Sequence, residues 1–134
     1  MKDATHLQLI EKAKTVLRPR QLSRDNSAGT VACALLSAAG NLYLGVCIDL
    51  QCGIGFCAEH SAVAAMITAG ESRIARIVAV SWEGAVLPPC GRCRELMVQI
   101  DGANYTDTEV ILGVSRVVKL KELLPHQFAE VRES

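Results

Sequence analysis

Apolar residues recur along the chain with two different periods, and each period predicts one kind of element. Residues 5–17 carry apolar side chains at helical spacing, which predicts an amphipathic helix. Thr5 and Gln8 have the spacing of a capping box at its start, and Pro19 ends it. The predicted apolar stripe of this helix consists of Leu7, Leu9, Ile10, Ala13, Val16 and Leu17.

Strands are predicted from runs of β-branched and apolar residues. Residues 30–36 and 42–48 flank the segment SAAGN and predict a hairpin with Gly40 and Asn41 in its turn. Residues 74–81 and 109–114 are continuous apolar runs, as in strands buried on both faces. Whether another strand follows the second of these runs is left open.

Three more helices alternate with the strands. The Ala-rich stretch 59–70 stops at Gly70, residues 91–100 are closed by Asp101 and Gly102, and a short helix ends before Pro125. An opening hairpin followed by alternating helices and buried strands predicts an α/β layered fold with a mixed sheet. Since no repeat or linker interrupts it, residues 1–134 are expected to form a single domain.

The charge balance excludes some classes of partner. Lys plus Arg equals Asp plus Glu, at 14 each, so the chain lacks the basic surplus that non-specific nucleic-acid or membrane binding needs. Its main positive cluster, Arg18, Arg20 and Arg24, is interrupted by Pro19 and is expected to be a solvated loop.

Neither a signal-peptide pattern nor a membrane-spanning run is recognisable in the sequence, which favours a cytoplasmic protein. In that compartment the six cysteines are expected to be buried thiols, metal ligands or catalytic groups rather than disulfides.

Three of the cysteines are spaced like ligands of a single ion. Cys57 precedes one predicted helix and Glu59 lies in its first turn, while Cys90 and Cys93 begin another helix. An i, i+3 pair points both sulfurs the same way, and the two helix N-termini can converge at one edge of the sheet. Three thiolates would leave a fourth position open, as in catalytic zinc sites.

Other cysteines and other chemistries remain as alternatives. Cys33 and Cys47 lie inside strand runs and are interpreted as buried free thiols, so Cys52 is the one rival as a fourth ligand. Cys90 and Cys93 alone would fit a thioredoxin-like redox pair or a structural zinc site. Neither explains Glu59, although a lone glutamate there is often favoured by the helix dipole.

Together, Cys57-x-Glu59 and Pro89-Cys90-x-x-Cys93 resemble the zinc-dependent deaminase signature. More narrowly, the chain resembles the cytidine deaminase family in its short three-cysteine form, to which blasticidin S deaminases also belong. Further matches are Arg94, the segment 31–49 and Glu122-Leu123-Leu124-Pro125 followed by Phe128. The resemblance implies a three-layer α/β/α fold whose central mixed sheet has about five strands.

The resemblance also implies the roles at the site. Cys57, Cys90 and Cys93 would hold one Zn²⁺ per chain, which lowers the pKa of a bound water. Glu59 would move protons between water, the substrate's ring nitrogen and the departing amine. Family members place arginines after the glutamate and after the last cysteine, which would donate to the thiolates. Arg94 stands at the second of these arginine positions. His60 stands at the first, and it is either such a donor or a partly exposed helix histidine without this role.

Positions that would contact the substrate depart from the family. Cytidine deaminases end the second strand with an Asn-x-Glu pair that binds ribose, where this chain has Cys47 and Asp49. Ala58, within the motif, would also contact the substrate. Phe128 would help to build the pocket of a neighbouring subunit in a homotetramer with shared active sites, or else cover its own core.

The predicted function is therefore zinc-dependent hydrolytic deamination of a cytidine- or deoxycytidine-like nucleoside, in pyrimidine salvage. The alternatives are deamination of another aminated heterocycle, such as a blasticidin S-like compound or a free base, and a non-catalytic zinc-stabilised ligand-binding protein. Deamination of polynucleotides is disfavoured by the neutral charge.

Overall fold

The computed structural model describes residues 5–130, so both ends of the predicted domain 1–134 lie outside the described part. Helix α1 spans His6–Lys14 and starts at the predicted capping box of Thr5 and Gln8. It buries Leu9, Ile10 and Ala13, whereas Leu7 is 50% exposed, contrary to the predicted stripe. At 100° per residue Leu7 lies about 115° around the helix from the centre of the buried side chains, so it faces outward.

The sheet is mixed, as predicted, but over the described residues it has seven strands rather than about five. The pairing order across it is β3 (Leu42–Asp49), β2 (Asn26–Ser37), β4 (Ile74–Ser81), β6 (Glu109–Gly113) and β7 (Arg116–Lys119). Within residues 5–130, β4 and β6 are the one parallel pair, and the other paired strands are antiparallel.

The two additional strands are short. β1 (Arg20–Ser23) pairs with the start of β2, and β5 (Val86–Leu87) pairs with β4. The expectation of a loop around Arg20 is therefore wrong, although every residue of β1 is exposed. β1 carries no apolar run, because an exposed edge strand is held by its ladder hydrogen bonds rather than by buried side chains.

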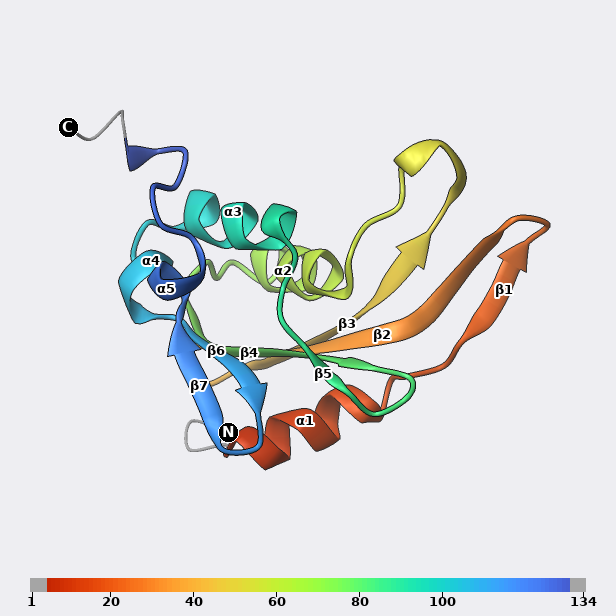
Figure 1. Ribbon diagram of the computed structural model, residues 1–134, viewed down its shortest axis with the longest axis horizontal. Coiled ribbons are helices and arrows are strands. Elements are labelled where there is room, and N and C mark those ends of the chain that lie inside the picture. Colours follow the sequence, from red (N-terminus) through yellow and green to blue (C-terminus); the bar gives the residue numbers. More distant parts are fainter. Residues whose placement is uncertain (1–4, 131–134) are drawn as a thin grey trace.

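Helices cover both faces of the sheet, which confirms the three-layer α/β/α arrangement (Figure 1). α1 packs on one face, and α2 (Ala58–Thr68) and α3 (Gly91–Ile100) lie over the other. Residues of β2 alternate between the two cores: Cys33 and Leu35 pack toward α2 and α3, while Ala32, Ala34 and Leu36 pack toward α1.

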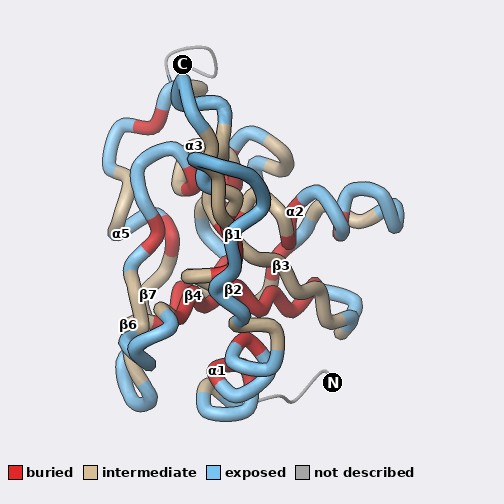
Figure 2. Tube along the Cα trace, turned by 90° about the vertical axis from the view of Figure 1, so that its right-hand side faces the viewer, coloured by how far each residue is buried: buried red, intermediate tan, exposed pale blue. Residues whose placement is uncertain are grey.

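Short elements complete the fold: η1 (Gln51–Gly53), α4 (Asn104–Asp107) and α5 (Leu120–Leu123). Of these, only α5 was expected from the sequence. Figure 2 shows that burial concentrates on β4 and the second half of β2, while β1 and the outer side of α1 are exposed. Within residues 5–130, no helix is long and apolar enough to cross a membrane.

The site is positioned by the two segments that lead into α2 and α3. Phe56 forms a β-bridge with Ile48 near the end of β3, so the chain re-enters the sheet edge immediately before α2 begins. β5 and the Pro88-Pro89 pair bring the other segment from β4 to the start of α3. Both helices therefore begin beside one another.

Candidate active site

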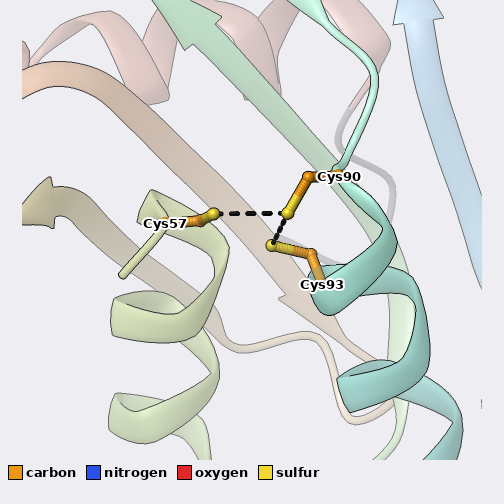
Figure 3. A group of neighbouring side chains, drawn as sticks. All are labelled: Cys57, Cys90 and Cys93. Carbon is orange, nitrogen blue, oxygen red and sulfur yellow. Dashed lines mark hydrogen bonds between the residues drawn. The ribbon is translucent and has the colours of Figure 1, made fainter. Parts of the chain in front are cut away.

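Three thiols from two helix starts form a compact cluster (Figure 3). Cys57 is the N-cap of α2, Cys90 is the N-cap of α3, and Cys93 lies in the first turn of α3. The Sγ of Cys90 is 3.4 Å from that of Cys57 and 3.5 Å from that of Cys93, and all three sulfurs lie within 4.8 Å of one another.

The geometry of this cluster fits Zn²⁺. Tetrahedral zinc with Zn–S bonds of about 2.3 Å requires sulfurs roughly 3.8 Å apart, close to these separations. Cys52 is not part of the cluster, which removes it as a fourth ligand. Three protein ligands leave one tetrahedral position for water, the arrangement of catalytic rather than structural zinc sites. A two-thiol redox pair would not account for Cys57 beside Cys90.

The surroundings of the three thiols shift their pKa values in different directions. Burial opposes ionisation of Cys90, but hydrogen bonds from the backbone N–H groups of Cys93 and Arg92, together with those to the Cys57 and Cys93 thiols, outweigh it, so its pKa is lowered. The pKa of Cys57 is raised, mainly by burial. Burial and then the charge of Glu59 raise the pKa of Cys93.

Glu59 is a carboxylate almost enclosed by protein beside this cluster. It is only 6% exposed in the first turn of α2. Burial raises its pKa, and its own backbone N–H and the Cys93 thiol act in the opposite direction. A small hollow beside it is lined by apolar side chains, including Ile77, Leu87 and Pro89. These surroundings hold the pKa of Glu59 above its ordinary value, which is the direction of shift that suits a carboxyl group used both to accept and to release a proton.

His60 lies against the cluster rather than in solvent. Its Nδ1 is 3.5 Å from the Sγ of Cys93. The imidazole stacks on Phe56, with ring centroids 6.0 Å apart and planes 18° from parallel. Burial, and then the positive charge of Arg92, lowers the His60 pKa, which favours the neutral ring. With its proton on Nδ1, this ring can donate to the Cys93 sulfur.

Arg94 has other partners than the sulfurs that it was expected to contact. Its Nε donates to the carbonyl oxygen of Pro89 at 2.7 Å, and its Nη1 donates to that of Leu123 at 2.8 Å. These two bonds orient the planar guanidinium toward backbone oxygens on either side of it.

Arg92 was missed in the sequence, although it stands between Cys90 and Cys93. Its Nη1 lies 3.3 Å from the carbonyl oxygen of Gly55 and donates to it, which links the start of α3 to the segment before Cys57. Its place between two candidate ligands could have singled out Arg92, but the sequence does not show that it bonds to the Gly55 carbonyl.

Cys47 and Asp49 lie on one face of β3, as residues two apart do. Cys47 is buried and belongs to the same core cluster as Ala58, whose side chain is also buried. The Cys47 Sγ is 3.3 Å from the hydroxyl oxygen of Thr30 and donates to Asp49 Oδ2 at 3.6 Å. Thr30 is a further polar group here that sequence reasoning did not identify. Cys33 is buried as predicted.

Phe128 is 69% exposed, so it does not cover the core of its own subunit. Its backbone N–H donates to Glu95 Oε1 at 3.0 Å, which holds it beside α3. The alternative that the ring covers the core of its own subunit is therefore wrong.

Comparison with known proteins assigns the family. Residues 4–106 match the family model described as the cytidine and deoxycytidylate deaminase zinc-binding region. This match spans the three thiols, Glu59 and His60.

Individual relatives agree with this match. The chain is 30% identical to a cytidine deaminase of Mycobacterium tuberculosis over 99 residues, 73% of this chain and 71% of that protein. It is 32% identical to a cytidine deaminase of Halalkalibacterium halodurans over 103 residues, 73% of this chain and 76% of that protein. The crystal structure of cytidine deaminase from M. tuberculosis superposes with a TM-score of 0.77 at 26% identity, covering 94% of this chain and 98% of that one. The chain therefore belongs to the cytidine and deoxycytidylate deaminase family and is a zinc-dependent deaminating hydrolase.

Proposed function

We propose that the protein hydrolyses the exocyclic amino group of a small pyrimidine nucleoside, cytidine or deoxycytidine, to the oxo form with release of ammonia. The observation that carries this proposal is the placement of Glu59, an almost fully buried carboxylate beside three thiols with zinc-ligand spacing. The names of the relatives point to the same substrate class.

Cys57, Cys90 and Cys93 would hold the zinc ion, whose Lewis acidity makes a water molecule acidic enough to react near neutral pH. Three thiolates and one Zn²⁺ carry a net charge of −1, which opposes that effect. The His60 ring beside Cys93 and the backbone N–H groups at the start of α3 offset part of this charge.

Glu59 performs the proton transfers. It takes a proton from the water as the oxygen adds to the ring carbon bearing the amino group, and gives it to the adjacent ring nitrogen. It then takes the remaining oxygen-bound proton and delivers it to the amino group. Ammonia leaves as the carbon–oxygen double bond forms. One carboxylate suffices because Glu59 returns to its starting protonation state after each turnover.

A change of substrate within the same chemistry is the second candidate. Cys47 cannot match the two-sided hydrogen bonding of an amide, and its thiol already contacts Thr30 and Asp49. This arrangement favours an aminated heterocycle, such as a blasticidin S-like compound or a free base, that does not need the ribose contact.

We further propose that each chain forms one domain and that four chains assemble into a homotetramer with shared active sites. This assembly would be cytoplasmic and act in pyrimidine salvage. Two surface features support assembly. The Phe128 ring is largely exposed near the C-terminal end of the described residues, and Ala64, Ala65 and Ile67 leave a face of α2 uncovered. Sedimentation of the purified protein tests the stoichiometry.

Glu59→Gln tests the reaction. The variant should fold and hold about one zinc per chain, while ammonia release from cytidine or deoxycytidine falls by about 10²–10⁴-fold. Glu11→Gln, an exposed carboxylate on α1 across the sheet, is the matched control. Parent-like ammonia release by the zinc-loaded Glu59→Gln protein would refute the mechanism. Zinc-loaded parent protein that deaminates neither these nucleosides nor other aminated heterocycles would instead favour ligand binding without catalysis.

A further inference from the structure

We propose that Arg94 is a positioning residue that couples the C-terminal segment, residues 120–128, to the turn that carries Cys90 and Cys93. The inference rests on the proposed role of these thiols as zinc ligands, and it extends that role to a part of the chain that holds no ligand.

On the side of the turn, Arg94 fixes the peptide group that leads into Cys90. The Pro89 carbonyl that accepts from its Nε, at 2.7 Å, belongs to the same planar unit as the Cys90 nitrogen. The Arg94 backbone N–H donates to the Cys90 carbonyl at 3.1 Å. That second bond is the first helical bond of α3 and does not depend on the side chain, so the arginine's own contribution is the bond to Pro89, just before Cys90, the most exposed of the three thiol residues.

On the side of the C-terminal segment, the same guanidinium satisfies the end of α5. This helix has four residues, so it is too short to be stable alone, and its last carbonyls lack partners within the helix. Arg94 donates to Leu123 O, and the Tyr105 hydroxyl donates to Leu124 O at 3.1 Å. A cation at a helix C-terminus is also electrostatically favourable.

A second contact runs in parallel with the first. Glu95, the next residue of α3, accepts the Phe128 N–H at 3.0 Å. Two consecutive residues after the last cysteine therefore hold the C-terminal segment at Leu123 and at Phe128. Leu120, which is fully buried, anchors the start of α5 in the core shared with α2 and α3.

This connection makes the order of the C-terminal segment and the affinity for zinc interdependent. If α5 loosens, Arg94 loses one of its two carbonyl partners and holds the Cys90 turn less firmly. By thermodynamic reciprocity, zinc on the three thiols should in turn stabilise residues 120–128.

The first experiment measures zinc release into excess chromogenic chelator at a temperature where every variant is folded by circular dichroism. Partners that orient metal ligands typically change metal affinity by about 10–100-fold. If this loss falls on dissociation, Arg94→Gln should release zinc about 10–100-fold faster than the parent. Arg94→Lys, which can reach only one carbonyl at a time, should fall between. Arg116→Gln, on the exposed start of β7, controls for the lost charge and should behave like the parent.

The decisive pair is Leu120→Ala and Leu9→Ala. Both residues are fully buried, but Leu9 lies in the core on the α1 face of the sheet. Leu120→Ala should speed zinc release severalfold and Leu9→Ala should not. If Arg94→Gln is fast and Leu120→Ala is parent-like, Arg94 acts on the site without the C-terminal segment, and the coupling is refuted. Parent-like release by Arg94→Gln also refutes it.

Hydrogen exchange tests the reverse direction. Zinc should slow amide exchange of residues 120–128 in the parent and have a much smaller effect in Arg94→Gln. A parent protein that retains no zinc would overturn the proposed function instead. In that case Arg94→Gln must still speed exchange of residues 120–128 in the metal-free protein, and equal rates would overturn the coupling as well.

Discussion

The imidazole Nδ1 of His60 lies 3.5 Å from the thiol sulfur of Cys93, and the ring is stacked on Phe56. The stack fixes the plane of the ring, so its N–H can point at a buried sulfur instead of at water. A donor to a metal-bound thiolate reduces the negative charge on that sulfur and holds it in place.

His60→Phe removes this donor and keeps an aromatic ring for the stack on Phe56. We expect the variant to bind zinc about 10–100-fold more weakly than the parent in competition with a chelator of known affinity. His60→Gln retains an N–H donor, so its zinc affinity should fall considerably less. Equal zinc affinity in His60→Phe and the parent would show that the contact does not support the site.

Gly45 allows α2 to lie directly on β3. A Cβ at this position would be 2.4 Å from the backbone nitrogen of Ala62 and 2.6 Å from the Cβ of Ser61, and helix backbone cannot move aside locally. Gly45→Ala should therefore lower the free energy of unfolding by about 1–3 kcal/mol, the usual range for overpacking.

Urea or thermal unfolding measures this loss. Gly102→Ala is the control, since no atom lies within 4 Å of its added Cβ. It should be neutral or slightly stabilising, because alanine restricts the unfolded chain. A Gly45→Ala protein as stable as Gly102→Ala would mean that α2 can shift away from β3 without loss.

The direction of each thiol could be predicted from the sequence because it is set within its own helix start, and the family signature joins the two helix starts. N-cap positions and an i, i+3 pair fix where Cys57, Cys90 and Cys93 point once the two helices are recognised. Long apolar runs likewise located β4 and β6, since strands buried on both faces require such runs.

Contacts between distant polar groups could not be predicted in this way. Asn104 accepts the Ile74 N–H at 2.9 Å and donates to Met97 O at 2.8 Å, which joins β4 to α3. The two carbonyl partners of Arg94 are of the same kind. Any arginine or asparagine in the sequence could make such bonds, and only the tertiary arrangement selects the backbone groups that it reaches.

The Glu71 carboxylate makes the free energy of unfolding depend on pH in the acid range. Its Oε2 accepts from the Tyr43 hydroxyl, and from Asn41 Nδ2 at 2.9 Å. The bond from Tyr43, and then those from Ser37 and Asn41, lower the Glu71 pKa. Because the folded pKa is below the unfolded one, the stabilisation is complete above about pH 4.3, the ordinary glutamate pKa, and disappears as the pH falls through the folded value.

Glu71→Gln should therefore be less stable than the parent at pH 7, and the difference should shrink as the pH falls from about 5 to 3. Urea unfolding at a series of pH values measures it. The exposed Glu83→Gln variant, in the turn between β4 and β5, controls for the loss of one negative charge. A difference between Glu71→Gln and the parent that stays constant over this range would contradict the linkage.

Cys47 and Asp49 give the most direct test of the substrate. If these positions weaken ribose binding, Cys47→Asn combined with Asp49→Glu should raise kcat/KM for cytidine, by roughly 10-fold for one restored hydrogen bond of about 1.4 kcal/mol. Cys33→Ala, which removes a buried thiol on the adjacent strand, is the control and should leave kcat/KM close to the parent value. Thr30 remains unchanged in all variants. A double variant that folds and binds zinc but gains nothing on cytidine would show that Cys47 and Asp49 do not limit ribose binding. A gain on cytidine with a matching loss on another aminated heterocycle would instead show that these two positions select the substrate.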